Sequence, residues 1–253
     1  MLHNSIYKKA TPKKSLNSAL QKAVLSGIKR CMPSKADSRV AFLLVHYDFP
    51  THMKISRSIT VKKAIAAMSF GFFAMLRFHS YQTFCLENLT LVLKGGKEVT
   101  PLVVGRKIVL NLLSSKSVVG FYFTFDDKFH PGARAYYCMV SDLHRNLRRV
   151  CPLRQLQIIL QISHNDSFFP KSEITRVVLT KNMEAIACIK KNIKPHSLRI
   201  GGHTYYTVYG LDAGFRDFVA RRKVNKATQT YYRASPYLTI YKLRQFFLRT
   251  FKG

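Results

Sequence analysis

Residues Pro195–Gly214 read PHSLRIGGHTYYTVYGLDAG, and this stretch indicates more about the fold than any other. Pro195 suits the first position of a helix, and the spacing of His196 and Arg199 places both side chains on one helical face. Gly201 and Gly202 are poor helix formers, and together they allow another backbone to approach closely. We therefore expect a helix that packs tightly against a neighbour. A His–Arg pair at this spacing is also common on solvated helix faces.

The segments on either side of this stretch predict an α+β fold. Beyond Pro195 the pattern is helical almost to Gly253. Upstream, Thr60 is a candidate cap for a long buried helix, VKKAIAAMSFGFFAMLR (61–77). Three β-rich runs follow over 89–125, broken at 95–96 and 114–117 as in an antiparallel meander, and polar and helical segments fill 136–192. We expect a mainly helical fold with a small antiparallel sheet.

The charge balance points to a polyanionic partner. The 253 residues include 42 Lys plus Arg and 12 Asp plus Glu, a formal net charge of +30. Hydrophobic residues make up 47%, enough for a folded core, which excludes wholesale disorder. A compact body with this surplus repels itself unless a polyanion is near. Nucleic acid is the first candidate, and an anionic membrane surface is the second.

Cysteine usage and hydropathy exclude several further classes. The five cysteines are scattered with no CxxC pair, which argues against a zinc finger or a disulfide framework and favours a reducing compartment. The longest apolar run, Ala64 to Leu76, is shorter than the about 20 residues that span a bilayer. The basic N-terminus has no apolar segment of a secretory signal behind it. We expect a soluble protein that is not secreted.

Two segments of this chain resemble the tyrosine recombinases, the phage integrase superfamily. The resemblance is to the recombinases of eukaryotic retroelements and their phage-like relatives in particular. HSLRIGGHT, GLDAGFRDFVARR and TQTYYRAS are similar to that family's C-terminal catalytic box, and AAMSFGFFAMLRFHSYQTFCLENLTLV resembles the helix that carries its first catalytic arginine. The resemblance covers about residues 55–240. It implies a tyrosine recombinase-like catalytic domain over 55–253. Residues 1–54 would then be a basic arm, a remnant helix (15–30) of the core-binding domain, and a linker.

The resemblance also assigns roles to individual residues. Arg77 and Arg199 would bind the equatorial oxygens of a phosphodiester with planar, charged forks. Tyr231 would attack the phosphorus and form a covalent 3′-phosphotyrosyl ester. His196 would accept a proton or hydrogen-bond a phosphate oxygen, and Lys116 on a β-hairpin would donate a proton to the departing 5′ oxygen. The implied reaction is strand cleavage and rejoining, as in the recombination or integration of a mobile element, with no metal and no cofactor.

The chain departs from the family pattern at three positions and leaves the nucleophile open between two tyrosines. Ser80 stands where the family has an acidic residue, Ala220 replaces a glycine, and Arg222 replaces the usual His or Trp of the site. Tyr231 is the expected nucleophile from its nine-residue spacing to Arg222, but a shift of one residue would select Tyr232. A catalytically inactive, DNA-binding derivative of the same fold is the leading alternative. A basic RNA-binding or ribosome-associated protein is a more distant one.

Further cations are candidates for contact with the DNA backbone: Arg145, Arg148, Arg149, Arg221 and Lys223. A merely solvated helix face is an equal alternative for the first three. The expected partner is double-stranded DNA, and the resemblance implies self-association into a synaptic tetramer. The expected compartment is the nucleus in a eukaryote and otherwise the cytoplasm with its nucleoid.

Overall fold

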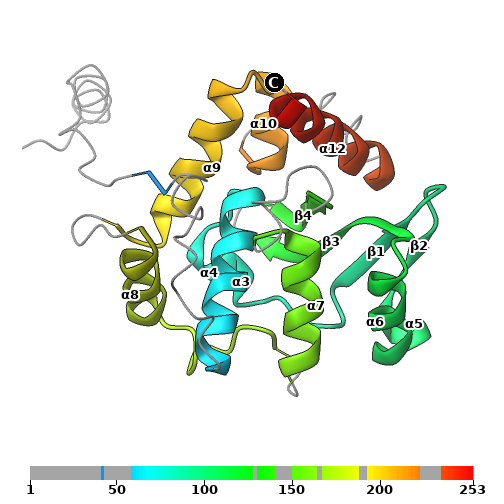
Figure 1. The fold of residues 1–253 in the computed structure, drawn as a ribbon, viewed down its shortest axis with the longest axis horizontal. Helices are drawn as coiled ribbons and strands as arrows, with labels where there is room; N and C mark the ends of the chain where they lie inside the picture. The colour runs from blue at the N-terminus through cyan, green and yellow to red at the C-terminus, as the bar shows by residue number, and fades with distance from the viewer. Residues whose placement is uncertain are drawn as a thin grey trace, which may run out of the picture. The chain divides into compact units, whose positions relative to one another are not determined.

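The computed structural model describes residues 41–42, 58–127, 130–140, 150–163, 167–187, 193–222 and 235–252. Helices predominate among them, and one four-stranded antiparallel sheet lies between the helices (Figure 1), so the predicted α+β class is confirmed. The elements in chain order are α3 (Ile59–Phe73), α4 (Phe78–Tyr81), β1 (Leu89–Leu93), β2 (Glu98–Val99), α5 (Pro101–Val104), α6 (Arg106–Ser114), β3 (Val118–Asp127), β4 (His130–Cys138), α7 (Pro152–Ile162), α8 (Arg176–Ala187), α9 (His196–Val208), α10 (Ala213–Val219) and α12 (Pro236–Lys252).

The internal contacts of the chain divide it into Met1–Ser38 and Arg39–Gly253, and every described residue belongs to the second unit. The helix expected over 15–30 lies outside the described residues. So does the predicted domain boundary after residue 54.

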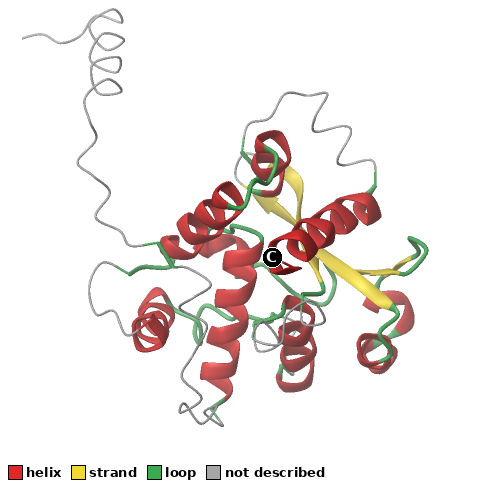
Figure 2. Ribbon diagram, turned by 45° about the horizontal axis from the view of Figure 1, so that its top comes forward, coloured by secondary structure: helices red, strands yellow, loops and turns green. Residues whose placement is uncertain are grey.

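The sheet has the strand order β2-β1-β3-β4, and each neighbouring pair is antiparallel. Side chains alternate along β3. Phe121 and Phe123 contact the ring of Phe70 in α3, whereas a side chain at Gly120 would meet Ile240 of α12. Helices α3 and α12 therefore cover opposite faces of the sheet, with α7 on the side of α3 (Figures 1 and 2).

The middle run of the expected β-meander forms only the short strand β2 and is helical beyond it, in α5 and α6, which corrects the prediction of three full strands over 89–125. In α6 the buried residues Val109 and Leu113 are four apart, the spacing of a helix face. Arg106 at the start of α6 donates hydrogen bonds to the backbone carbonyl of Leu160 and so fixes α6 against α7. The expectation of helical and polar sequence from residue 136 is also wrong at its start, because β4 continues to Cys138.

Helix α3 runs through the core, as its apolar composition predicts. Ten of its 15 residues are buried. The residue before the helix is Ser58, so Thr60 lies inside the first turn and is not the cap. The side chain of Lys63 is 5% exposed, and its Nζ lies 2.6 Å from Oε2 of Glu173, which compensates the buried charge. The helix ends just before Met75, whose φ of 48° is left-handed.

Helix α9 crosses α3 at backbone-to-backbone distance, as the two glycines predict. A Cβ atom on Gly202 would lie 2.3 Å from the carbonyl oxygen of Phe72 in α3. A Cβ on Gly201 would lie 1.8 Å from the carbonyl oxygen of Phe42, whose backbone N–H donates to the carbonyl of Ser197 at 3.0 Å. Only glycine fits both positions, and the crossing brings the start of α9 beside the end of α3.

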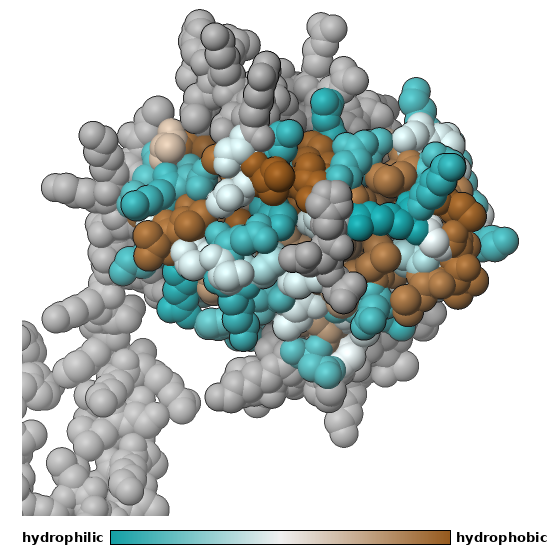
Figure 3. Space-filling view, turned by 90° about the horizontal axis from the view of Figure 1, so that it is seen from below, coloured by the Kyte–Doolittle hydropathy of each residue, from teal (hydrophilic) through white to brown (hydrophobic). Residues whose placement is uncertain are grey.

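The surface mixes polar and apolar side chains. The view from below in Figure 3 shows hydrophilic and hydrophobic residues interspersed, with brown areas on the side where α5 and α6 lie. Leu102 and Val103 of α5 are 66% and 83% exposed. Among the described residues, none of the helices has both the length and the hydropathy needed to cross a bilayer.

Candidate active site

The two segments that carry the resemblance meet at the backbone carbonyl of Met75. Arg199, in the first turn of α9, donates from Nη1 to this carbonyl and from Nη2 to the carbonyl of Ala220 at 2.9 Å. Arg221 also donates to the Met75 carbonyl, at 3.1 Å from Nη2. Arg199 and Met75 are 124 residues apart in sequence. Their hydrogen bond brings the His–Arg segment next to Arg77, the candidate arginine that follows Met75.

The backbone at this junction adopts uncommon conformations. Met75 has a φ of 48° and Arg221 a φ of 53°, and the only other non-glycine residue with positive φ in the described part of the chain is Lys116, at 57°. Left-handed conformations of such residues cost about 1 kcal/mol or more each and persist where the surroundings fix them. Here Arg199 and Arg221, both 8% exposed, supply buried hydrogen bonds to the Met75 carbonyl. The junction is therefore held in one arrangement.

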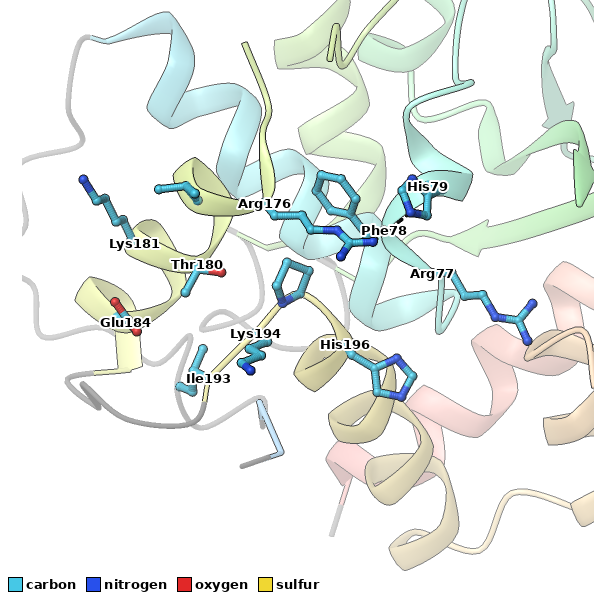
Figure 4. A pocket seen from close by; sticks show the side chains of 12 residues that line it. Arg77, Phe78, His79, Arg176, Thr180, Lys181, Glu184, Ile193, Lys194 and His196 are labelled. Atoms are coloured by element: carbon cyan, nitrogen blue, oxygen red, sulfur yellow. Dashed lines mark hydrogen bonds between the residues drawn. The ribbon is translucent and has the colours of Figure 1, made fainter. Parts of the chain in front are cut away.

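Arg77 and His196 line one cavity of about 700 Å³. Arg77 immediately precedes α4, and His196 begins α9, so the cavity lies where α4, α8 and the start of α9 come together. In Figure 4, Arg77 and His196 stand at one side of the cavity, and Lys181 and Glu184 of α8 stand at the other. The structure thus brings together a candidate from each of the two segments.

A second cluster of charge surrounds Arg222, next to the junction. Its Nη1 lies 3.7 Å from Oδ1 of Asp217, and its side chain is 47% exposed. Burial, followed by the charges of Arg222 and Arg216, lowers the pKa of His203. Arg199 has the same effect more weakly, so Arg199 and Arg222 share one electrostatic neighbourhood. The Nε2 atom of His203 is buried and has no hydrogen-bond partner among the described residues.

Lys116 does not join these residues. It lies in the turn between α6 and β3, next to Ser117, whose carbonyl accepts from the backbone N–H of Lys94. Arg221 lies at the other end of β3, with its guanidinium carbon 5.6 Å from the ring centroid of Phe125. The seven residue-to-residue steps from Val118 to Phe125 extend about 23 Å at a strand's rise per residue. The turn that holds Lys116 connects a helix to a strand, whereas the resemblance implies a β-hairpin.

Two sequence candidates have environments that the sequence did not predict. Arg221, expected at the DNA backbone, is buried and donates to the carbonyls of Val219, Ala74 and Met75. These contacts indicate a positioning role. Ser80, which replaces the family's acidic residue, is 8% exposed. A carboxylate there would be buried, and serine avoids that cost.

The remaining candidates lie outside the described residues. They are the expected nucleophile and its neighbour, and four of the five expected DNA contacts: Tyr231, Tyr232, Arg145, Arg148, Arg149 and Lys223.

Sequence reasoning did not place Arg176, Lys181, Lys194 or His79 at the site. All four line the cavity with Arg77 and His196. Nothing in the local sequence distinguishes them from the chain's many other basic residues. Only the packing of α8 against α4 and the start of α9 brings them together.

Within the described ranges, no group of three His, Cys, Asp or Glu side chains is arranged to hold a metal ion. A scan against protein-family models and searches of curated proteins and of solved structures find nothing that matches the chain.

Proposed function

We propose that this protein cleaves and rejoins DNA strands through a covalent 3′-phosphotyrosyl intermediate, as a tyrosine recombinase of a mobile element does. The observation that carries the proposal is the junction at Met75. Two segments that resemble this family's catalytic boxes are distant in sequence, and the buried side chain of Arg199 joins them. Arg77 and His196, one from each segment, then line a single cavity. The proximity of these positions is expected for a tyrosine recombinase site and is not expected for an unrelated basic protein.

The proposed reaction needs groups that offset negative charge and move one proton at each end. The oxygen of Tyr231 attacks the phosphorus, the bond between phosphorus and the tyrosine oxygen forms, and the bond to the 5′ oxygen breaks. His196 accepts the phenolic proton or hydrogen-bonds a phosphate oxygen, and a lysine gives a proton to the leaving 5′ oxygen. Arg77 and Arg222 add positive charge where the pentacovalent phosphorus gains negative charge. Attack by a 5′ hydroxyl on the phosphotyrosyl ester reverses each step and rejoins a strand.

A second candidate function, DNA binding without cleavage, is favoured by the environment of Arg199. This arginine is 8% exposed and donates to two backbone carbonyls. A side chain held in this way stabilises the fold, and it offers less of its guanidinium to a phosphate than an exposed arginine does. Lys116, the expected general acid, lies far from the junction, and this also favours DNA binding without cleavage.

Covalent trapping separates the two candidates. The full-length protein is incubated with a pool of nicked duplexes whose central sequence is randomised, so that the released 5′ fragment diffuses away and the adduct accumulates. We expect a DNA-linked species on denaturing gels that disappears in Tyr231→Phe and persists in Tyr232→Phe. Arg77→Ala should lower the rate of adduct formation about 100-fold. Salt-sensitive binding of the same pool without any adduct would support the binding derivative and refute cleavage.

The same assay identifies the lysine that protonates the leaving group. The connection between β3 and β4 contains Lys128, which makes it a second candidate beside Lys116. A substrate whose 5′ bridging oxygen is replaced by sulfur needs no proton on its leaving group. The variant that loses the general acid should be slow on the oxygen substrate and near wild-type on the sulfur substrate. We expect this rescue for one of Lys116→Ala and Lys128→Ala, and its absence in both would remove these two lysines from the mechanism.

A further inference from the structure

The cavity beside Arg77 carries more positive charge than the proposed cleavage chemistry uses. Its lining includes four cationic side chains, Arg77, Arg176, Lys181 and Lys194, against the single carboxylate of Glu184. Residues 193–196, which lead into the start of α9, form another part of the wall. A helix start adds partial positive charge from its N–H groups. The cavity therefore has a strongly positive potential.

Arg176 is fixed in this cavity without a carboxylate. Its guanidinium carbon lies 5.5 Å from the ring centroid of Phe78, and its Nη2 lies 2.8 Å from Nε2 of His79 (Figure 4). Within the part of the chain that the structure describes, no ion pair involves Arg176, whereas Lys63 is paired with a carboxylate. A guanidinium held by a ring face and a neutral group keeps its full charge for a ligand.

The contact also defines the state of His79. A guanidinium has only N–H donors, so Nε2 of His79 must accept the hydrogen bond. The imidazole therefore helps to orient the guanidinium of Arg176. Phe78 and His79 follow Arg77 directly in sequence, so Arg176 contacts the same short segment that carries Arg77.

We propose that this cavity is a phosphodiester-binding subsite in which Arg176 contacts the DNA backbone phosphate next to the one held at Arg77 and His196. The inference rests on the proposed function. Phosphates repeat along a strand, so a strand with one phosphate near Arg77 and His196 would bring the next phosphate toward Arg176, which lines the same cavity. A volume of about 700 Å³ is in the range of sites that hold a nucleotide-sized ligand. Lys181 and Lys194 then contact the phosphate through more flexible point charges.

Salt-dependent binding to duplex DNA tests this subsite without requiring cleavage. Each phosphate contact that is lost should reduce the slope of log K against log salt by about 0.9. For Arg176→Gln we expect this reduction and an about tenfold weaker Kd at 0.1 M salt. Lys107→Gln, an exposed change on α6 outside the cavity, is the matched control and should leave both quantities unchanged. Equal effects of the two substitutions, or no effect of Arg176→Gln, would overturn the proposal.

Two further variants separate charge from orientation. Phe78→Leu keeps Arg176 but removes the ring beneath it, so the slope should stay at the wild-type value while Kd weakens. Lys181→Gln should reduce the slope as Arg176→Gln does. A slope change on an RNA hairpin but not on duplex DNA would also overturn the assignment.

The trapping assay distinguishes failure of the subsite proposal from failure of the proposed cleavage function. An adduct that forms equally fast in Arg176→Gln and wild type, with unchanged salt slopes, refutes the subsite and leaves cleavage standing. Arg176-dependent binding with no adduct from any variant refutes cleavage and leaves a phosphate-binding subsite.

Discussion

Replacing Gly202 by alanine tests whether α9 crosses α3 as closely as the structure shows. The new Cβ would lie 2.3 Å from the carbonyl oxygen of Phe72 and 3.3 Å from its carbon. Carbon–oxygen contacts between close-packed backbones normally lie near 3.3–3.6 Å, so the helices must separate by about 1 Å. No side-chain rotation relieves this clash, because the opposing atoms belong to the backbone.

Two opposing effects set the change in folding stability that Gly202→Ala causes. Strain of this kind costs about 3 kcal/mol, the upper part of the range for overpacked cores. Alanine recovers about 1 kcal/mol, since it is the better helix former. The net loss of stability is about 2 kcal/mol, which corresponds to a Tm lowered by about 4–8 °C for a chain of this size.

Gly71→Ala is the matched control, because it lies in α3 at the same interface. Its Cβ would lie 3.0 Å from Cδ1 of Leu198, the end of a flexible side chain that can rotate away. The gain in helix propensity then dominates, and this variant should be as stable as wild type or more so. Thermal and urea unfolding of both variants measure the difference. Equal stability of Gly202→Ala and Gly71→Ala would refute the backbone crossing and the placement of Arg199 that depends on it.

Two further predictions concern buried polar groups near the junction. Tyr206→Phe should destabilise the protein by about 1–2 kcal/mol in urea unfolding, because the buried hydroxyl donates to the carbonyl of Phe73 at 2.7 Å and the carbonyl would lose this donor. Tyr81→Phe should be neutral or stabilising, since the Tyr81 hydroxyl is buried with no hydrogen-bond partner among the described residues, and a cost equal to that of Tyr206→Phe would contradict this reasoning. The third prediction concerns His203, whose pKa is lowered in the folded state by burial and then by the charge of Arg222. As the pH falls below about 6.5, the unfolded chain binds a proton at this histidine that the folded chain does not bind. The free energy of unfolding therefore decreases with falling pH until the lowered pKa of the folded state is reached. His203→Gln should remove this part of the pH dependence of Tm, and an unchanged pH profile would show that His203 titrates normally.

The helices were the most predictable part of the fold. The apolar composition of α3 predicts a buried helix, and the paired glycines of α9 predict a close backbone approach, because both signals are local to the segment that carries them. The prediction of a full strand in the middle of the expected meander was wrong because the deciding signal there is not local. The β-branched residues of this run favour strands, but the burial of Val109 and Leu113 against the body of the protein decides for a helix, and that burial depends on residues distant in sequence.

The candidate site divides in the same way. The sequence by itself predicts a polyanionic partner, from a net charge of +30, and it singles out Arg77, His196 and Arg199 as candidates through their spacing and resemblance. Tertiary structure alone decided that Arg199 is buried against the Met75 carbonyl and that Lys116 lies at the far end of β3. It also places Arg176 in one cavity with Arg77, without an ion pair to any carboxylate of the described residues. The physical reason is that charge and helical period are properties of a local stretch of chain. The environment of a guanidinium, by contrast, depends on which carbonyls, rings and carboxylates the packing of distant helices brings within a few ångströms of it.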